Sequence, residues 1–480
     1  MKNTLKSFFP LALLTALLSF GCEFKQIRQS FTGANTLSGE TQQPETRALR
    51  GPILHFLADP TQTARLEDAV QYFEDGLLIL EDGKVAQLGE ARDLLANLNP
   101  KISVTTLAPD QILMPGFIDT HIHFPQTEMI GSYGEQLLDW LKKYTFPTEQ
   151  KFKDRNYAGH IADIFLKELL RNGTTTALVF GTVHKESADV LFEKASALDM
   201  RLIAGKVMMD RNAPEYLTDT PTSSYADSKE LIEKWHKKGR LLYAITPRFA
   251  PTSSPEQLEM AQKLKQEYPD VYVHTHLSEN LNEIAWVKEL FPERKGYLDV
   301  YHTYGLTGPT SIFAHAVHLT DDEFKLMAET QSAVAFCPTS NLFLGSGLFP
   351  LHKAKAFGVK VGLGTDVGAG TSFSHFESLG EAYKIMQLQS KKLSAYEGFY
   401  LATLGGAKSL KLDSKIGNLA PGKEADFIVV NLAATDLARL RLAQSQHLED
   451  KLFALMTIGD DRNIAATYVA GRLVYQEEHK

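Results

Sequence analysis

Cysteine is nearly absent from this 480-residue sequence, which contains only Cys22 and Cys337. Two cysteines cannot form a framework of several disulfides, and no Cys-x-x-Cys pair is present to bind a metal or carry redox chemistry. Blocks of basic residues are missing too, and the formal net charge is -8. This balance disfavours polyanionic partners, so we expect no binding to nucleic acid.

Long apolar runs are rare, and the run near the N-terminus, FFPLALLTALLSFG, is too short for a comfortable membrane span. Lys2 and Lys6 precede it and Cys22 follows it, a pattern typical of a secretion signal. The Gly-Cys pair also resembles a bacterial lipoprotein cleavage site. We therefore predict a signal segment over residues 1–22, a polar tether over 23–48, and export or lipid anchoring in a bacterium. The protein is cytoplasmic if the translation start is mis-set or the signal is not used.

The centre of the chain alternates short apolar strands with amphipathic helices such as SPEQLEMAQKLKQEY over 254–268. Repeated strand–helix units imply parallel pairing, and about eight such units fit between residues 115 and 411. This pattern predicts a TIM-type (β/α)8 barrel of the α/β class. The expected strands are the one ending at residue 123 and those at 174–181, 201–209, 241–249, 271–279, 311–319, 332–340 and 360–366.

Strand patterns without intervening helices occupy both ends of the remaining sequence. Asp82-Gly83 separates two alternating apolar runs, which indicates a hairpin. Similar patterns return in IGNLAPGKEADFIVVN and AATYVAGRLVYQEE. We predict that residues 49–114 and 412–480 fold together as a small β-sandwich domain beside the barrel.

Histidines and carboxylates follow the predicted barrel strands. His121 and His123 share one strand face in MPGFIDTHIHF, because side chains two residues apart point the same way. His276 ends another strand, and His315 and Asp366 end two more. The carboxyl ends of barrel strands form the rim where chemistry occurs. Three imidazoles and a carboxylate with an open position for water are typical of a catalytic zinc site.

Each of these residues also has a structural explanation when taken alone. A single His-x-His pair is a weak motif. Asp366 by itself would be expected to cap the following helix. Their occurrence together at barrel strand ends favours a metal site. For the other histidines near these strands or elsewhere in the chain we expect structural roles; they are His274, His302, His318, His352 and His375.

Together these motifs resemble the amidohydrolase superfamily in its deaminase branch, and longer stretches are similar to the guanine deaminase family over about residues 49–475. The resemblance implies hydrolysis of guanine to xanthine and ammonia, one divalent metal ion and a homodimer. The stretches are GFIDTHIHFPQTEMIGSYGEQLLDWLKKYTFPTE, ITPRFAPTSS, VHTHLSEN, FCPTSNLFLGSG and GTDVGAGTSF.

The resemblance also assigns roles by position. The metal ligands are His121, His123, His276 and Asp366, with zinc expected and iron as the alternative ion. His315 lies beside the metal and holds the water or the tetrahedral intermediate. The substrate-binding residues are Gln126, Arg248, Phe249, His276 and Glu279. Thr127 departs from the family pattern, because some members carry an aromatic residue there.

These residues suit the reaction. Zinc lowers the pKa of a bound water from 15.7 to about 7, so hydroxide is available to attack the amino-bearing carbon. We expect Asp366 to shuttle the water proton, Glu279 to protonate a ring nitrogen and His315 to steady the new oxygen. Arg248 suits a purine carbonyl, so adenine should be a poor substrate. The structural alternative for Glu279 is favourable charge at a helix N-terminus.

Two other functions remain open from the sequence. One is a related amidohydrolase acting on another aminated purine, a pterin or a triazine. The other is a barrel that has lost its metal and serves as an exported binding protein. Guanine deaminases built on the cytidine-deaminase cysteine pattern are excluded by the cysteine count.

The N-terminal prediction is tested by mass spectrometry of the mature protein from its native membrane fraction. We expect chains that begin at a diacylated Cys22. An intact Met1 or an unmodified internal start would contradict the lipid anchor.

Overall fold

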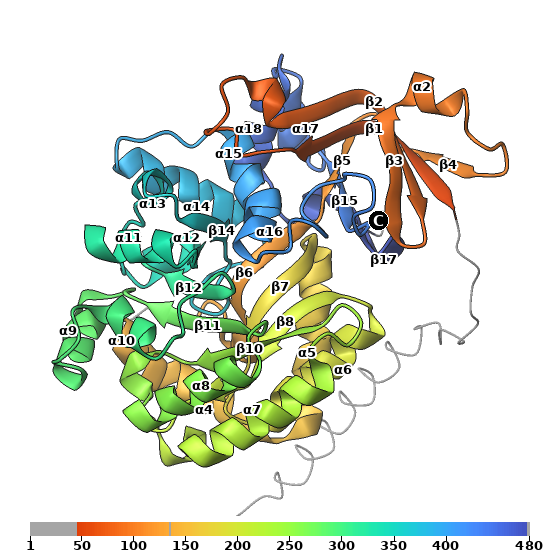
Figure 1. Cartoon of the computed structure of the whole chain (residues 1–480). Coiled ribbons are helices and arrows are strands. Elements are labelled where there is room, and N and C mark those ends of the chain that lie inside the picture. The colour runs from red at the N-terminus through yellow and green to blue at the C-terminus, as the bar shows by residue number, and fades with distance from the viewer. Residues whose placement is uncertain (1–45, 134–135, 478–480) are drawn as a thin grey trace, which may run out of the picture. The chain divides into compact units, whose positions relative to one another are not determined.

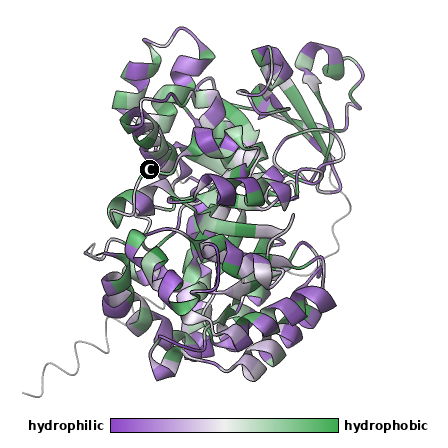
Figure 2. Cartoon of the chain, turned by 60° about the vertical axis from the view of Figure 1, so that its left-hand side comes forward, coloured by the Kyte–Doolittle hydropathy of each residue, from purple (hydrophilic) through white to green (hydrophobic). Residues whose placement is uncertain are grey.

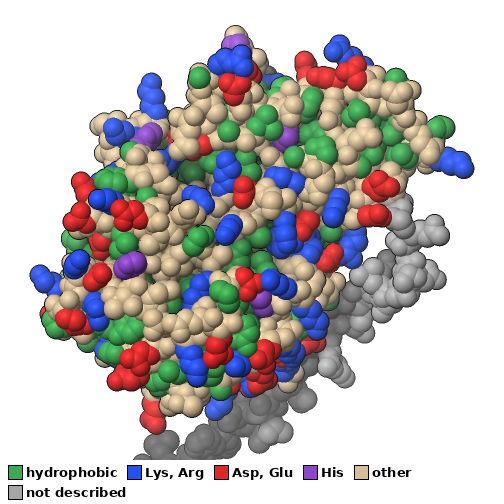
Figure 3. All heavy atoms as spheres, viewed as in Figure 1, with side chains coloured by type: hydrophobic (Ala, Val, Ile, Leu, Met, Phe, Trp, Pro, Cys, Tyr) green, Lys and Arg blue, Asp and Glu red, His purple; other side chains and the backbone are tan. Residues whose placement is uncertain are grey.

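The computed structural model describes residues 46–133 and 136–477. The predicted signal segment and Cys22 lie outside the described residues. Two parts are evident, a barrel and a mixed sheet (Figure 1). In the described part of the chain, no helix is both long and apolar enough to cross a membrane. On the face shown in Figure 3, acidic and basic side chains are interspersed.

Eight parallel strands form a nearly closed barrel, which confirms the predicted fold class. Both faces of these strands are covered, so the strands are buried along almost their whole length and lie inside a layer of more polar helices (Figure 2). In spatial order the strands are β6 (Phe117–His123), β7 (Thr174–Phe180), β8 (Arg201–Gly205), β10 (Leu242–Pro247), β11 (Tyr272–Leu277), β12 (Ser311–His315), β13 (Ala333–Phe336) and β14 (Lys360–Leu363). The short β9 (Val207–Met208) pairs with β10.

Helices on the outside connect successive strands. Helix α8 begins one residue after the start of its predicted range, because the Ser254 hydroxyl accepts a hydrogen bond from the Gln257 amide and caps it. The long connecting helices are α5 (Arg155–Arg171), α6 (Lys185–Ala197), α7 (Pro221–Trp235), α8 (Pro255–Glu267), α9 (Leu281–Leu290), α11 (Asp321–Glu329) and α14 (His375–Leu388).

The barrel closes where the first strand meets the segment after the last strand. The Asp366 amide donates to the His121 carbonyl at 2.9 Å, and the His123 amide donates to the Val367 carbonyl at 2.9 Å. A Cβ at Gly362 would lie only 2.4 Å from Cγ2 of Thr120, so this close approach requires glycine. Closure thus places Asp366 directly beside the two histidines of β6.

The second part is a mixed sheet of eight strands that combines both ends of the described chain, as predicted. Its centre is the antiparallel pair of β5 and β15. Asp82 and Gly83 both have positive φ in the β2–β3 hairpin, as a tight two-residue turn requires. The path is β17 (Arg472–Gln476), β16 (Ile464–Val469), β15 (Phe427–Asn431), β5 (Gln111–Pro115), β1 (Arg47–Phe56), β2 (Val70–Glu81) and β3 (Lys84–Glu90), with β4 (Ser103–Thr106) beside β1.

A largely buried ionic cluster joins this sheet to the barrel. Glu424, just before β15, accepts from Nε of Arg201 at 2.7 Å and from Nε of Arg240 at 3.0 Å. Arg240 also pairs with Asp426. The two arginine side chains are 4% and 11% exposed, so both depend on these carboxylates for compensation of their charge.

Replacement of Glu424 by alanine should therefore lower the free energy of unfolding by about 3 kcal/mol, because it leaves the buried Arg201 guanidinium without a carboxylate and removes one of the two carboxylates that pair with Arg240. Equilibrium urea unfolding measures this change. The control is Glu67→Ala, which removes one of the acidic partners of Arg65 from an ion pair with both side chains exposed. Equal destabilisation by the two substitutions would contradict the role of the cluster.

Candidate active site

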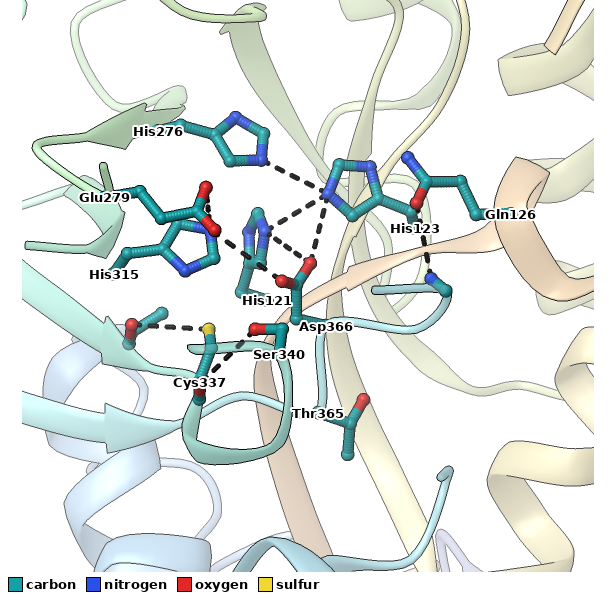
Figure 4. Close-up of polar contacts among 12 residues, drawn as sticks. His121, His123, Gln126, His276, Glu279, His315, Cys337, Ser340, Thr365 and Asp366 are labelled. Carbon is teal, nitrogen blue, oxygen red and sulfur yellow. Dashed lines mark hydrogen bonds and ion pairs between the residues drawn. The ribbon is translucent and has the colours of Figure 1, made fainter. Parts of the chain in front are cut away.

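Three histidines from two barrel strands converge at the carboxyl ends of those strands (Figure 4). Nε2 of His123 lies 3.2 Å from Nε2 of His121 and 3.2 Å from Nε2 of His276. Oδ1 of Asp366 lies 3.1 Å from Nε2 of His121 and 3.3 Å from Nε2 of His123. The structure thus brings together all four residues that the sequence predicted as metal ligands.

The protonation of these histidines suits metal binding. Nδ1 of His276 is 2.7 Å from the Arg248 carbonyl, which only accepts, so Nδ1 carries the proton and Nε2 keeps a lone pair. Nδ1 of His121 is 2.7 Å from Nε2 of His274. Burial lowers the pKa of His123 to about 3 and that of His276 well below its usual value, so both imidazoles are neutral at pH 7.

The spacing of these atoms also fits a metal ion. Ligands about 2.1 Å from a tetrahedral ion lie about 3.4 Å from one another, close to the four separations observed. Neutral imidazoles and one carboxylate accept zinc and other first-row divalent ions. The residues present therefore fit a single divalent cation.

The backbone at two of the strand ends is strained. His315 has a φ of 72° and Asp366 a φ of 52°, a conformation that is costly for residues with a Cβ. Asp366 does not cap a helix, because α14 begins at His375 and has Ser374 as its N-cap residue. The capping alternative for Asp366 is therefore wrong, and its side chain points to the histidines instead (Figure 4).

The two acidic residues of the site have opposite protonation. Burial opposes the charge of Asp366, but the adjacent His121 and His123 hold its pKa well below the usual range. Burial, together with the negative charge of Asp366, raises the pKa of Glu279 to about 8. At neutral pH Asp366 is therefore a proton acceptor and Glu279 a proton donor.

Glu279 is oriented by the site and not by the helix that follows it. The Ser346 hydroxyl donates to its Oε1 at 3.0 Å, and Nε2 of His315 lies 3.4 Å from its Oε2. The N-terminus of α9 is capped by Asn280 and Glu283, which form a capping box. His315 is itself held by Oδ1 of Asn341, 3.0 Å from its Nδ1.

A pocket lies beside these groups, with about 400 Å³ of space between atoms, part of it open to solvent. Part of its apolar lining comes from α3 (Leu137–Trp140) and from Leu141, which follows it. Its polar lining comes from the carboxyl ends of barrel strands and the segments after them. All five residues predicted to bind substrate line the cavity. The lining residues are His123, Gln126, Leu137, Trp140, Leu141, Arg248, Phe249, His276, Glu279, His315, Leu344, Asp366 and Ala369.

The sequence alone did not identify several residues that support the site. His274 was expected to be structural, yet it contacts the predicted ligand His121. Its position two residues before His276 was the only available signal. Glu149 ends the YTFPTE stretch and contacts Arg248, and nothing in its spacing indicated this. Asn341 and Ser346 lie in the segment after β13, whose motif carried no role for them.

The contact between His274 and His121 yields a prediction about metal affinity. His274→Ala should lower the affinity for zinc about 10- to 100-fold, because it removes the group that orients the ligand imidazole. Competition with a chromogenic chelator measures the affinity without reference to activity. His302→Ala, which changes an exposed histidine on α10 (Tyr297–Thr303), is the control. Unchanged affinity in the His274 variant would contradict this role.

Comparison with known proteins agrees with this arrangement. The model of the amidohydrolase family matches residues 112–474. The chain is 60% identical over 430 residues to the guanine deaminase of Escherichia coli (strain K12), covering 90% of this chain and 98% of that protein.

Solved structures extend the likeness to the fold. The E. coli guanine deaminase superimposes with a TM-score of 0.88, covering 90% of this chain and 100% of that one. The guanine deaminase from C. acetobutylicum, described with guanine bound in its active site, has 32% identity and a TM-score of 0.81, with coverage of 90% and 100%. The chain belongs to the amidohydrolase family and, within it, to the group of the guanine deaminases.

Proposed function

We propose that this protein hydrolyses guanine to xanthine and ammonia. The observation that carries the proposal is one cavity lined by the predicted metal ligands His123, His276 and Asp366, by Glu279, whose pKa is raised to about 8, and by Gln126, Arg248 and Phe249. The relatives described above, one of them with guanine bound, support the same reaction. A barrel without a metal site is disfavoured, because all four ligands are present and converge.

The ion proposed for the site is zinc, with iron as the other candidate for an imidazole and carboxylate set. When bound, such an ion lowers the pKa of water to about 7 and so supplies hydroxide at neutral pH. Asp366, whose carboxylate is ionised, accepts the proton that the attacking water loses.

Glu279 and Asp366 then complete the proton balance. Glu279 gives its proton to the ring nitrogen beside the amino-bearing carbon as the carbon–oxygen bond forms. The carbon–nitrogen bond breaks when Asp366 passes its proton to the departing amine, which leaves as ammonia. Glu279 regains a proton from the new hydroxyl group, and the carbonyl of xanthine forms. His315, 3.4 Å from Glu279, is placed to steady that oxygen.

Recognition of guanine follows from three neighbouring groups. The planar Arg248 guanidinium suits the purine carbonyl oxygen, and Gln126 offers both a donor and an acceptor. Phe249 provides an apolar ring against which the base can stack. Adenine presents an amine where guanine presents the carbonyl, so it would leave buried donors unpaired.

The proposal is tested by ammonia release from guanine. The wild type with zinc should be active, and Glu279→Gln should reduce kcat/KM about 10²- to 10⁴-fold because glutamine cannot transfer a proton. Zinc content should be equal in the two proteins, which separates loss of proton transfer from loss of metal. Adenine serves as the control substrate for the wild type.

Two results would overturn parts of this assignment. Retained activity of Glu279→Gln would refute the proton transfer by Glu279. Comparable turnover of adenine and guanine, or preferential turnover of a pterin or triazine, would refute the roles of Arg248 and Gln126.

The assembly and location of the protein are also proposals. The resemblance to guanine deaminases supports a homodimer. The N-terminal pattern of Lys2, Lys6 and the apolar run before Cys22 supports a lipid anchor as the only membrane contact.

A further inference from the structure

A buried carboxylate lies behind the two residues that are proposed to recognise the purine. Glu149, the last residue of α4 (Phe146–Glu149), is completely buried. Nη1 of Arg248 donates to both of its oxygens, at 3.0 Å and 2.8 Å. Nε2 of Gln126 donates to its Oε1 at 3.2 Å. One acidic side chain therefore contacts both recognition residues.

This contact determines which edge of the Arg248 guanidinium remains for a ligand. Nη1 is occupied by Glu149, and the central carbon lies 5.7 Å from the centre of the Phe146 ring. Within residues 46–133 and 136–477, Nε and Nη2 of Arg248 have no hydrogen-bond partner. Arg248 lines the cavity, so its remaining N–H groups are available to an acceptor on a bound base.

The same carboxylate orients the amide of Gln126. A carboxylate only accepts, so the amide nitrogen must face Glu149. The amide oxygen accepts from the Gly368 backbone N–H at 3.3 Å. With both ends held, the glutamine presents a fixed arrangement of one donor and one acceptor to the cavity.

We propose that Glu149 is a positioning residue that sets the preference of this site for a purine with a carbonyl group. Glu149 acts through Arg248 and Gln126. Its role rests on the proposed function, because those two residues are taken to contact the base. The simpler alternative is that Glu149 only neutralises a buried arginine. That alternative predicts that a substitution of Glu149 lowers the affinity for every purine by the same factor.

Binding of two purines that cannot be deaminated separates these possibilities. Hypoxanthine carries the ring carbonyl and unsubstituted purine lacks it, while neither has an amino group to lose. Isothermal titration calorimetry of the zinc-loaded wild type should show tighter binding of hypoxanthine. Glu149→Gln should lower the affinity for hypoxanthine about 10- to 100-fold, because Arg248 loses the carboxylate that fixes its orientation. The affinity for purine should be nearly unchanged.

A matched substitution controls for the loss of any buried carboxylate. Glu397, on α15 (Ala395–Tyr400), is buried and accepts from Nζ of Lys355 at 2.7 Å, and it does not line the cavity. Glu397→Gln should leave the ratio of the two affinities at the wild-type value. If Glu149→Gln fails to fold, Glu149→Asp is the second variant, which keeps the charge but shortens the side chain. It should lower the ratio of hypoxanthine affinity to purine affinity below the wild-type value, by less than expected for Glu149→Gln.

A double substitution shows whether Glu149 acts through Arg248. In the Arg248→Met background, Glu149→Gln should cause little further loss of hypoxanthine affinity, because the group it positions is already gone. The inference would be overturned if Glu149→Gln lowered the affinities for both purines equally, or if the losses of hypoxanthine affinity in the two single variants were additive in the double variant. A wild type that does not prefer hypoxanthine would also overturn it. A wild type that prefers hypoxanthine but releases no ammonia from guanine would instead refute the proposed function.

Discussion

Closure of the barrel is the constraint on which the rest of the site depends. Two backbone hydrogen bonds, from Asp366 to His121 and from His123 to Val367, join the first strand to the segment after the last. They bring the carboxylate within 3.3 Å of both histidines, although more than two hundred residues separate them in the chain. A divalent ion needs ligands from both sides of this junction, so metal binding and barrel closure reinforce each other.

The buried position of the junction sets the acid–base chemistry. In a site with little water, imidazoles stay neutral and a carboxyl group is protonated unless positive or polar partners oppose this. Asp366 has such partners in His121 and His123, whereas Glu279 has the negative charge of Asp366 nearby. The two carboxyl groups therefore reach opposite protonation states within one cavity, which is what a hydrolysis with two proton transfers requires.

The sheet from the two chain ends contacts the barrel away from this chemistry. Glu424 and Asp426 reach Arg201, at the start of β8, and Arg240, just before β10. These are the amino ends of the strands, opposite the rim that carries the histidines. The ionic cluster thus stabilises the joint between the two parts without restricting access to the cavity.

The barrel, the β domain built from both ends of the chain and the four ligand candidates could all be predicted from the sequence. Strand alternation and His-x-His spacing are local patterns, and the family resemblance rests on contiguous stretches. The folded chain was needed to show that Asp366 is not a helix cap, that His274 contacts His121 and that Glu149 holds Arg248. These contacts join residues roughly a hundred or more positions apart. No local pattern encodes such distant pairs, because their distances and the burial that shifts the pKa of Glu279 arise only when the barrel closes.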